Sequence, residues 1–171
     1  MSSTFPLLVR ESVPHWLGIA VALAVVALVV NPVMSADRSL KKGDKIVFLG
    51  DSITQAGERP DGYIQIVREF LKVNRAELEL EVIGAGISGN KVPDLERRLD
   101  KDVLSHKPDV VVVYIGINDV WHSQSGQGTS KEDFEAGLGR LIERIETSGA
   151  RVVLCTPSVI GEKPLGTNSL D

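Results

Sequence analysis

The sequence predicts an α/β fold: a three-layer sandwich in which helices cover both faces of a parallel sheet. Three observations support it. Strand-like apolar runs alternate with helix-period stretches from residue 45 to residue 157. Residues 110–115 are apolar throughout and rich in β-branching, which is typical of a strand covered on both faces. The 171 residues are 43% hydrophobic and 25% charged, the composition of an ordinary folding domain.

The first half of the predicted fold contains two strands and one helix. Residues 46–49 form a short apolar run that ends at Gly50, so we expect the first strand there. Apolar residues from position 63 to position 71 recur at helical spacing and predict the first helix. Residues 77–82 alternate glutamate with leucine or valine. That period of two predicts a second strand with one solvent-facing side, at an edge of the sheet.

A second helix and a third strand follow. Leu95, Leu99 and Val103 are four residues apart and predict a helix that ends before Pro108. The apolar run at 110–115 comes directly afterwards and is the third strand.

The last predicted elements are a third helix and a fourth strand. Residues 130–133, Ser-Lys-Glu-Asp, resemble a capping box, and Gly149 stands where a C-terminal glycine cap is expected. Residues 151–156 return as an apolar strand. The resulting βαβαβαβ order implies right-handed crossovers, and ligands of such sheets bind beyond the carboxyl ends of the strands.

The N-terminal segment is predicted to direct export. Residues 12–36 contain no charged side chain, and residues 17–30 are apolar throughout. Pro32 and the small residues before position 37 complete the layout of a signal peptide. We therefore expect residues 1–36 to be a signal peptide, or else an uncleaved anchor, and residues 37–171 to be a domain in the periplasm or outside the cell. Membrane contact is expected only through an uncleaved N-terminal segment.

Charge and cysteine content narrow the class of partner. The formal net charge is −4, and residues 1–36 hold one acidic and one basic residue, so the exported part keeps this value. Nucleic-acid binding requires a concentrated basic face, and none is visible, so no nucleic-acid partner is expected. Cys155 is the single cysteine and cannot form a disulfide within the chain. A small uncharged or carbohydrate-like substrate fits this composition.

Polar residues with complementary chemistry follow three successive strands. Ser52 comes just after the first strand, Gly89 after the second and Asn118 after the third. A serine hydroxyl surrounded by its own N–H, a glycine N–H and an asparagine amide has the parts needed for acyl transfer. Each piece alone is ordinary turn chemistry. Their order at the same end of neighbouring strands is what favours a catalytic site.

The second loop also permits another interpretation. Residues 84–89 satisfy G-x-G-x-x-G between a strand and a helix, which is the dinucleotide-binding fingerprint. That fingerprint also requires an acidic residue at the end of the following strand. Asp109 has suitable spacing but precedes its strand. Dinucleotide binding is therefore the weaker alternative.

These motifs resemble those of the SGNH, or GDSL-type, esterases and lipases over residues 45–157. Gly-Asp-Ser-Ile-Thr is similar to the family's first block, with Ser52 as the nucleophile. Ile-Ser-Gly and Gly-Ile-Asn-Asp are similar to the next two blocks, in which Gly89 lends a backbone N–H and Asn118 a side-chain N–H to the oxyanion hole. Gly84 departs from the family pattern, because many relatives carry asparagine there, and we expect it to loosen the second loop.

The resemblance implies a flavodoxin-like fold and an exported esterase or lipase that cleaves carboxylic esters through an acyl-serine intermediate. The substrate would be a small acyl ester or an acetylated carbohydrate. No metal or cofactor is implied, and the sequence has no cluster of His, Cys and acidic residues at ligand spacing. Asp51 and Asp119 are expected to organise their loops by hydrogen bonds.

The histidine base is the part of the predicted site for which the sequence offers no clear residue. His15 lies in the export segment and His106 at the opposite end of the sheet from Ser52, so His122 is the remaining candidate. The family pairs its histidine with an aspartate three residues earlier, near the C-terminus, and no such block follows the fourth strand. We therefore expect a domain that is incomplete at its C-terminus, either a fragment or a truncation.

Two further expectations follow from the absent block. If the chain is a true truncation, it would be a non-catalytic, ligand-binding remnant of the same fold. In either case, Asp51, Trp121 and His122 are candidates for the wall of the substrate cleft, the last two because they lie close to Asn118 in the sequence.

Overall fold

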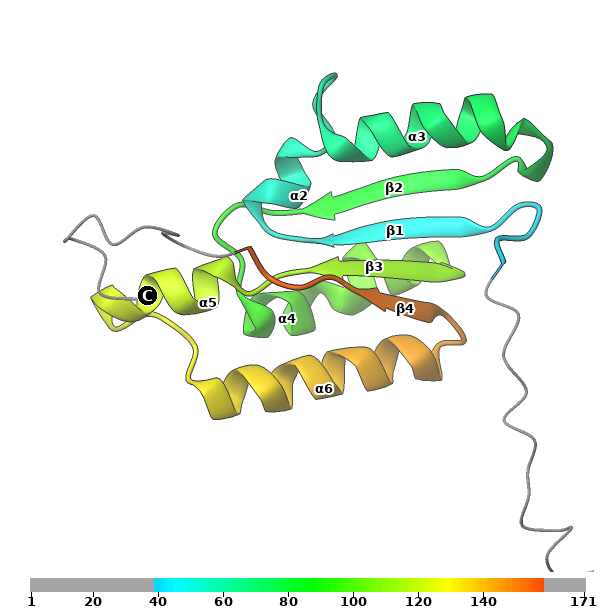
Figure 1. Cartoon of the computed structure of the whole chain (residues 1–171). Coiled ribbons are helices and arrows are strands. Elements are labelled where there is room, and N and C mark those ends of the chain that lie inside the picture. The colour runs from blue at the N-terminus through cyan, green and yellow to red at the C-terminus, as the bar shows by residue number, and fades with distance from the viewer. Residues whose placement is uncertain (1–38, 159–171) are drawn as a thin grey trace, which may run out of the picture. The chain divides into compact units, whose positions relative to one another are not determined.

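The computed structural model describes residues 39–158, and a four-stranded parallel sheet forms their centre (Figure 1). In chain order the strands are β1 (Lys45–Gly50), β2 (Glu81–Gly86), β3 (Val110–Tyr114) and β4 (Arg151–Leu154). Their spatial order is β2-β1-β3-β4, and every neighbouring pair is parallel. All four strands therefore end at the same edge of the sheet.

Helices cover both faces of this sheet (Figure 1). Helix α3 packs on one face, and helices α4 and α6 pack on the other. The α-helices are α2 (Ser52–Ala56), α3 (Tyr63–Asn74), α4 (Val92–Asp102), α5 (Ile117–Trp121) and α6 (Lys131–Thr147), and the short 3-10 helices are η1 (Ala76–Leu78), η2 (Leu104–His106) and η3 (His122–Ser125). The predicted three-layer α/β fold with a parallel sheet is confirmed.

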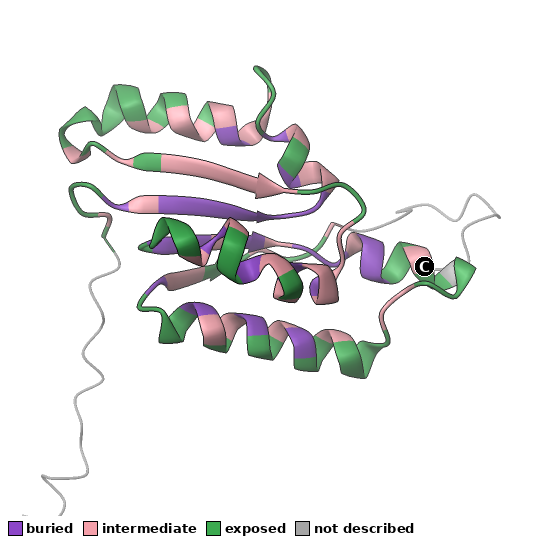
Figure 2. Ribbon diagram, turned by 180° about the vertical axis from the view of Figure 1, so that it is seen from behind, coloured by how far each residue is buried: buried purple, intermediate pink, exposed green. Residues whose placement is uncertain are grey.

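The central strand β1 divides the core into two apolar clusters. Val47 and Leu49 face the layer of α4 and α6, and their cluster includes buried leucines of both helices and Ile145 of α6. Ile46 and Phe48 point the other way and pack with Ile64 of α3. Figure 2 shows the result as a buried strand between helices whose outer sides are exposed. Alternate residues of one strand thus hold both helical layers in place.

Leu99 provides a test of this packing. Its side chain is fully buried in the cluster between the sheet and the α4–α6 layer. We expect Leu99→Ala to lower the free energy of unfolding by about 2–5 kcal/mol, because the truncation removes buried methyl groups and leaves a cavity. Urea unfolding measures this loss. Leu154→Ala is the control, since Leu154 is 48% exposed and should cost much less. Equal losses in the two variants would contradict the assigned core.

The second strand begins later than the sequence pattern predicted. The glutamate alternation suggested a strand over residues 77–82, but residues 76–78 form η1 and β2 starts at Glu81. Between them Glu79 adopts a left-handed conformation, with φ 49°, which ends the turn. The prediction of a strand at 77–80 was therefore wrong. The prediction that this strand lies at an edge of the sheet is confirmed.

The expectation for Gly84 was also wrong. Gly84 lies inside β2, where it is in register with Phe48 of β1, and it is not part of the loop that follows the strand. Its lack of a side chain leaves room for Glu58, because a β-carbon at Gly84 would overlap the Glu58 carboxylate. Gly84 therefore affects how Glu58 lies against the strand and does not loosen the loop.

The predicted third helix is closely matched by α6. The Ser130 hydroxyl accepts a hydrogen bond from the Asp133 N–H at 3.0 Å, which satisfies one of the free amides at the helix start. Aspartate thus serves here in place of the usual glutamate or glutamine. Gly149 follows the helix with φ 94°, the left-handed conformation that permits the chain to turn into β4.

The predicted export segment, residues 1–36, lies outside the described residues. Within residues 39–158, no helix has the length and apolar character required to cross a membrane.

Candidate active site

Three segments lie side by side at the carboxyl edge of the sheet. They are Asp51 with α2 after β1, the loop of residues 87–91 after β2, and α5 after β3 (Figure 1). The Ser88 N–H donates to Gln55 Oε1 at 2.9 Å and so joins the second segment to the first. The Asn118 amide nitrogen donates to the Asn90 carbonyl at 3.0 Å and to Asp51 Oδ2 at 3.4 Å. Each segment is thus hydrogen-bonded to the other two.

Ser52 is the first residue of α2 and is half-buried. Asp51 caps this short helix, with its Oδ1 accepting from the Ile53 N–H at 2.9 Å. The Ser52 N–H occupies the first position of the helix, where an amide has no partner within the helix itself. The serine therefore presents a hydroxyl and an N–H from a turn that its neighbour holds in place.

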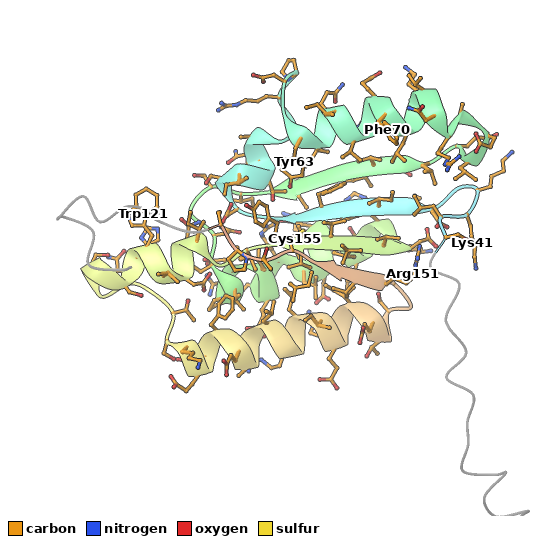
Figure 3. All side chains as sticks on the ribbon, in the orientation of Figure 1. Lys41, Tyr63, Phe70, Trp121, Arg151 and Cys155 are labelled. Atoms are coloured by element: carbon orange, nitrogen blue, oxygen red, sulfur yellow. The ribbon has the colours of Figure 1, made fainter. Side chains whose placement is uncertain are left out.

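An open pocket lies beside Ser52. Its volume is about 450 Å³, and its lining includes Ser52, Arg59, Asp61 and Tyr63. The Tyr63 hydroxyl donates to Thr54 Oγ1 at 3.1 Å, so α3 is fixed to α2 next to the serine (Figure 3). The pocket thus combines a serine with both a cationic and an anionic side chain.

Gly89 lies in the turn between β2 and α4 and is exposed. Its φ of +77° is in the left-handed region, and no other atom lies within 4 Å of where a β-carbon would be. The backbone conformation, and not a lack of space, therefore favours glycine at this position. Packing contributes little to this turn, so hydrogen bonds must hold it.

Asn118 is 4% exposed and lies in the first turn of α5. Its two amide hydrogens are directed to Asn90 and Asp51, and the 3.4 Å bond to Asp51 is at the long end of the hydrogen-bond range. Asn118 therefore joins the segments that carry the other two predicted site residues.

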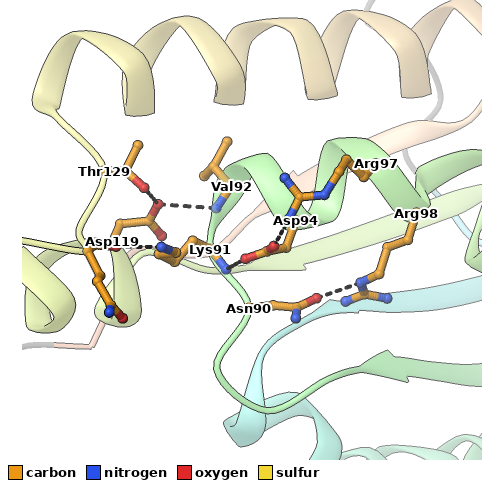
Figure 4. A network of polar contacts seen from close by, with 9 residues as sticks. Asn90, Lys91, Val92, Asp94, Arg97, Arg98, Asp119 and Thr129 are labelled. Carbon is orange, nitrogen blue, oxygen red and sulfur yellow. Dashed lines mark hydrogen bonds and ion pairs between the residues drawn. The ribbon is translucent and has the colours of Figure 1, made fainter.

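Asp51 and Asp119 are both buried beneath the site, at 1% and 2% exposure. Asp119 Oδ1 accepts from the Val92 N–H at 3.1 Å and from the Thr129 hydroxyl at 2.5 Å (Figure 4). Both carboxylates thus bind the first residues of helices, as expected for groups that organise loops. At this exposure Asp51 is not positioned to form the wall of an open cleft, although the sequence suggested it as a candidate.

Burial raises the pKa of both carboxyls above the ordinary value of 3.8. Hydrogen bonds partly offset this rise in pKa: Asp51 accepts one from Ile53, and Asp119 accepts one each from Thr129 and Val92. Asp119 Oδ2 is buried without a hydrogen-bond partner among the described residues. The charged form of Asp119 is therefore incompletely solvated by the protein.

These shifts predict how stability depends on pH. A carboxyl with a raised folded-state pKa binds its proton more tightly in the native state, so its contribution is fully present below pH 3.8 and is lost as pH rises through the raised value. We expect Asp119→Asn to flatten this decline above pH 3.8 in urea unfolding. Glu146→Gln, which removes an exposed carboxyl of α6, is the control. An unchanged slope in Asp119→Asn would contradict the assignment.

Of the two aromatic cleft candidates, Trp121 is the last residue of α5 (Figure 3), and His122 follows as the first residue of η3. Trp121 is 58% exposed, and its ring centroid is 6.3 Å from that of the half-buried His122. Within residues 39–158 no hydrogen bond links either residue to Ser52, and His106 is exposed at the end of η2. The cleft role of Trp121 and His122 stays a prediction, and neither histidine is placed as a base for Ser52.

Three residues that connect the site, Arg98, Asn90 and Gln55, were not predicted from the sequence. The signal for Arg98 was available, because it stands between Leu95 and Leu99 on the buried side of α4, where a charged residue is unusual. Asn90 and Gln55 act through contacts between loops that are distant in the sequence. No pattern within one loop reveals such contacts.

The structure places the glycines of the dinucleotide fingerprint differently from what that motif requires. Gly84 and Gly86 are both paired within β2, and the Val92 N–H at the start of α4 is taken by Asp119. A pyrophosphate would need these amides free. In the described part of the chain, no three His, Cys, Asp or Glu side chains form a group that could hold a metal ion.

Comparison with known proteins identifies the family. Residues 48–170 match the model of the GDSL-like lipase/acylhydrolase family. An acetylxylan esterase of Geobacillus stearothermophilus is 36% identical over 134 residues, which is 69% of this chain and 61% of that protein. The lipoprotein YqeF of Bacillus subtilis (strain 168) is 27% identical over 128 residues, 69% of this chain and 51% of that protein.

Comparison with solved structures supports the same family. The acetyl xylan esterase AlAXEase superimposes with a TM-score of 0.68 and 48% identity, over 74% of this chain and 64% of that one. Axe2 of Geobacillus stearothermophilus, an acetylxylan esterase, gives a TM-score of 0.64 and 35% identity, over 69% of this chain and 61% of that one. The chain therefore spans about half to two thirds of the length of these relatives. It belongs to the GDSL-like lipase/acylhydrolase family.

Proposed function

We propose that this protein hydrolyses carboxylic esters, with Ser52 as the nucleophile and Gly89 and Asn118 as oxyanion donors. The observation that carries the proposal is the mutual hydrogen bonding of three strand-end segments around a serine that lines an open pocket. Family membership supports it, since the matched family is one of lipases and acylhydrolases.

The chemistry follows from these groups. The Ser52 oxygen attacks the ester carbonyl carbon while its proton passes to a base, and the carbonyl oxygen gains negative charge. The Ser52 and Gly89 N–H groups stabilise that charge, and the Asn118 amide joins them by releasing its long 3.4 Å bond to Asp51. The alcohol then leaves with a proton, and water hydrolyses the acyl-serine.

The base is proposed to be a histidine paired with an aspartate, outside residues 39–158. Support comes from Axe2, of which catalytic mutants have been solved that replace an aspartate, a histidine or a serine with alanine. A free serine hydroxyl is a weak nucleophile, so such a base accounts for much of the rate.

The proposed substrate is an acetylated carbohydrate. Acetylxylan esterases are among the relatives of the chain. The pocket beside Ser52 supports the same class, because Arg59 and Asp61 can donate to and accept from sugar hydroxyls, and its volume of about 450 Å³ suits a small alcohol portion. We further propose that residues 1–36 export the domain to the periplasm or the cell exterior.

Acetate release tests the proposal. The 171-residue protein is incubated with acetylated xylo-oligosaccharide, with and without added imidazole, which can substitute for a distant base. We expect acetate release above that of imidazole and buffer alone, and faster release than from a matched butyryl ester. Release no faster than the controls in both conditions would overturn the proposal.

One observation favours a second candidate, a binding domain without turnover: within residues 39–158 the Ser52 hydroxyl has no hydrogen-bond partner. This candidate predicts saturable calorimetric binding of the acetylated oligosaccharide with no acetate released under either condition.

A further inference from the structure

The Arg98 guanidinium joins the carboxyl ends of two strands. One of its terminal nitrogens donates to the Gly50 carbonyl at 2.8 Å and to the Ala85 carbonyl at 2.9 Å. Gly50 is the last residue of β1 and precedes the Asp51-Ser52 turn. Ala85 lies one residue before the end of β2 and precedes the loop that carries Gly89.

The same side chain reaches the Gly89 loop directly. Arg98 Nε donates to the Asn90 side-chain oxygen at 2.7 Å (Figure 4), and the Asn90 backbone carbonyl accepts from Asn118 at 3.0 Å. The remaining terminal nitrogen pairs with Asp102 at 3.3 Å. One planar group is therefore connected to the segments that carry Ser52 and Gly89, and through Asn90 to Asn118.

Burying the charged Arg98 guanidinium costs free energy unless its N–H groups find acceptors within the protein. The Arg98 side chain is only 12% exposed, whereas the neighbouring Arg97 is 71% exposed and pairs with Asp94 at the surface. Burial lowers the pKa of Arg98, and its pairing with Asp102 partly offsets this. A lysine carries its three N–H donors on one nitrogen, so it could not reach the separate acceptors that Arg98 meets with three nitrogens.

The loop that Arg98 contacts has few other restraints. Residues 87–89 are exposed, and no other atom lies within 4 Å of a β-carbon position at Gly89. Besides Arg98 and Asn118, its first half is held by the Ile87 N–H on Gly50 at 3.2 Å and the Ser88 N–H on Gln55 at 2.9 Å. Its last residue, Lys91, is held separately: its N–H donates to Asp94 at 2.8 Å and its Nζ to the Gln127 carbonyl. Without the Arg98 bonds, the loop that carries Gly89 would therefore be freer to move relative to the Asp51-Ser52 turn.

We propose that Arg98 is a positioning residue that fixes the Gly89 N–H and the Asn118 amide relative to Ser52. The proposal rests on the proposed ester hydrolysis for its catalytic consequence and on the contacts above for the positioning itself. Displacing a reacting group by about 1 Å can cost about 10²-fold in rate.

The test compares Arg98→Lys and Arg98→Met with the matched controls Arg97→Lys and Arg97→Met in the 171-residue protein. Hydrogen exchange of the amides of residues 87–90 is measured together with urea unfolding. The Lys91 amide is left out because it donates to Asp94, the partner of Arg97. We expect exchange in this loop to rise about tenfold or more in both Arg98 variants, beyond the change in global stability, and to stay unchanged in both Arg97 variants.

Turnover of an acetyl ester supplies the second measurement. We expect kcat to fall about 10²-fold in Arg98→Met and nearly as far in Arg98→Lys, with KM within about threefold of the unmodified protein. If the unmodified protein shows no Ser52-dependent turnover, the proposed function fails, and the exchange measurement still decides the positioning role of Arg98.

Three outcomes would overturn the proposal. One is loop exchange equal to that of the Arg97 variants. Another is a rise spread over β1, β2 and α4 in proportion to lost global stability, which marks a residue that only supports the fold. The third is faster loop exchange with kcat unchanged in an active protein.

Discussion

Replacing Ser52 with alanine is expected to lower kcat for acetyl-ester hydrolysis by about 10³-fold or more, because no other group can form the acyl intermediate. The fold should be unaffected. Ser52 is half-buried at the start of α2, and the helix cap comes from the Asp51 carboxylate. The free energy of unfolding should therefore change by no more than about 0.5 kcal/mol. Steady-state kinetics and urea unfolding of the same preparation give both values.

Ser105→Ala is the matched control for this variant. Ser105 is exposed on η2, and its hydroxyl donates to the Lys101 carbonyl at 2.6 Å, away from the proposed site. Its kcat should equal that of the unmodified protein. If Ser52→Ala retains activity comparable to Ser105→Ala, with or without imidazole, Ser52 is not the nucleophile.

The second large effect is expected from Asn118→Ala. This change removes an oxyanion donor and also the bonds to the Asn90 carbonyl and to Asp51. Loss of one oxyanion donor costs about 10²–10³-fold in kcat. Because Asn118 is buried, the free energy of unfolding should also fall, by about 1–3 kcal/mol. KM should change little, since the donor acts mainly on the charge that develops during the reaction.

Asn74→Ala is the control for Asn118. Asn74 ends α3 in an exposed position and donates to the Phe70 carbonyl at 2.8 Å. Asn74→Ala therefore removes an asparagine side chain that also donates to a backbone carbonyl but is not linked to the proposed site. A rise in KM with unchanged kcat in Asn118→Ala would assign that residue to ground-state binding and contradict an oxyanion role.

Most of the fold was predictable because its elements carry strong local signals. The continuous apolar runs became β1 and β3, and the capping pattern at Ser130 became the start of α6. The error at β2 has a physical cause. Glutamates alternating with leucines satisfy the period of a strand, but the backbone there forms η1 and a left-handed residue at Glu79, which a periodicity argument does not detect.

The candidate site was predictable in its parts and less so in its connections. Ser52, Gly89 and Asn118 follow successive parallel strands, so sheet topology alone brings their segments to one edge. The contacts that join those segments are between residues far apart in the sequence: Gln55 contacts Ser88, and Arg98 contacts Gly50. The Arg98 contact depends on how α4 packs against the sheet, and the Gln55 contact depends on how α2 meets the loop after β2. No single stretch of sequence specifies either arrangement.

Covalent labelling of Ser52 tests the central claim most directly. The folded 171-residue protein is treated with a fluorophosphonate, with imidazole present and absent, and its intact mass and peptide map are recorded. We predict one phosphonyl group per chain, on Ser52, and its loss in Ser52→Ala. A folded protein that takes up no label under either condition, or that is labelled at another residue, would contradict an acyl-transfer site built on Ser52.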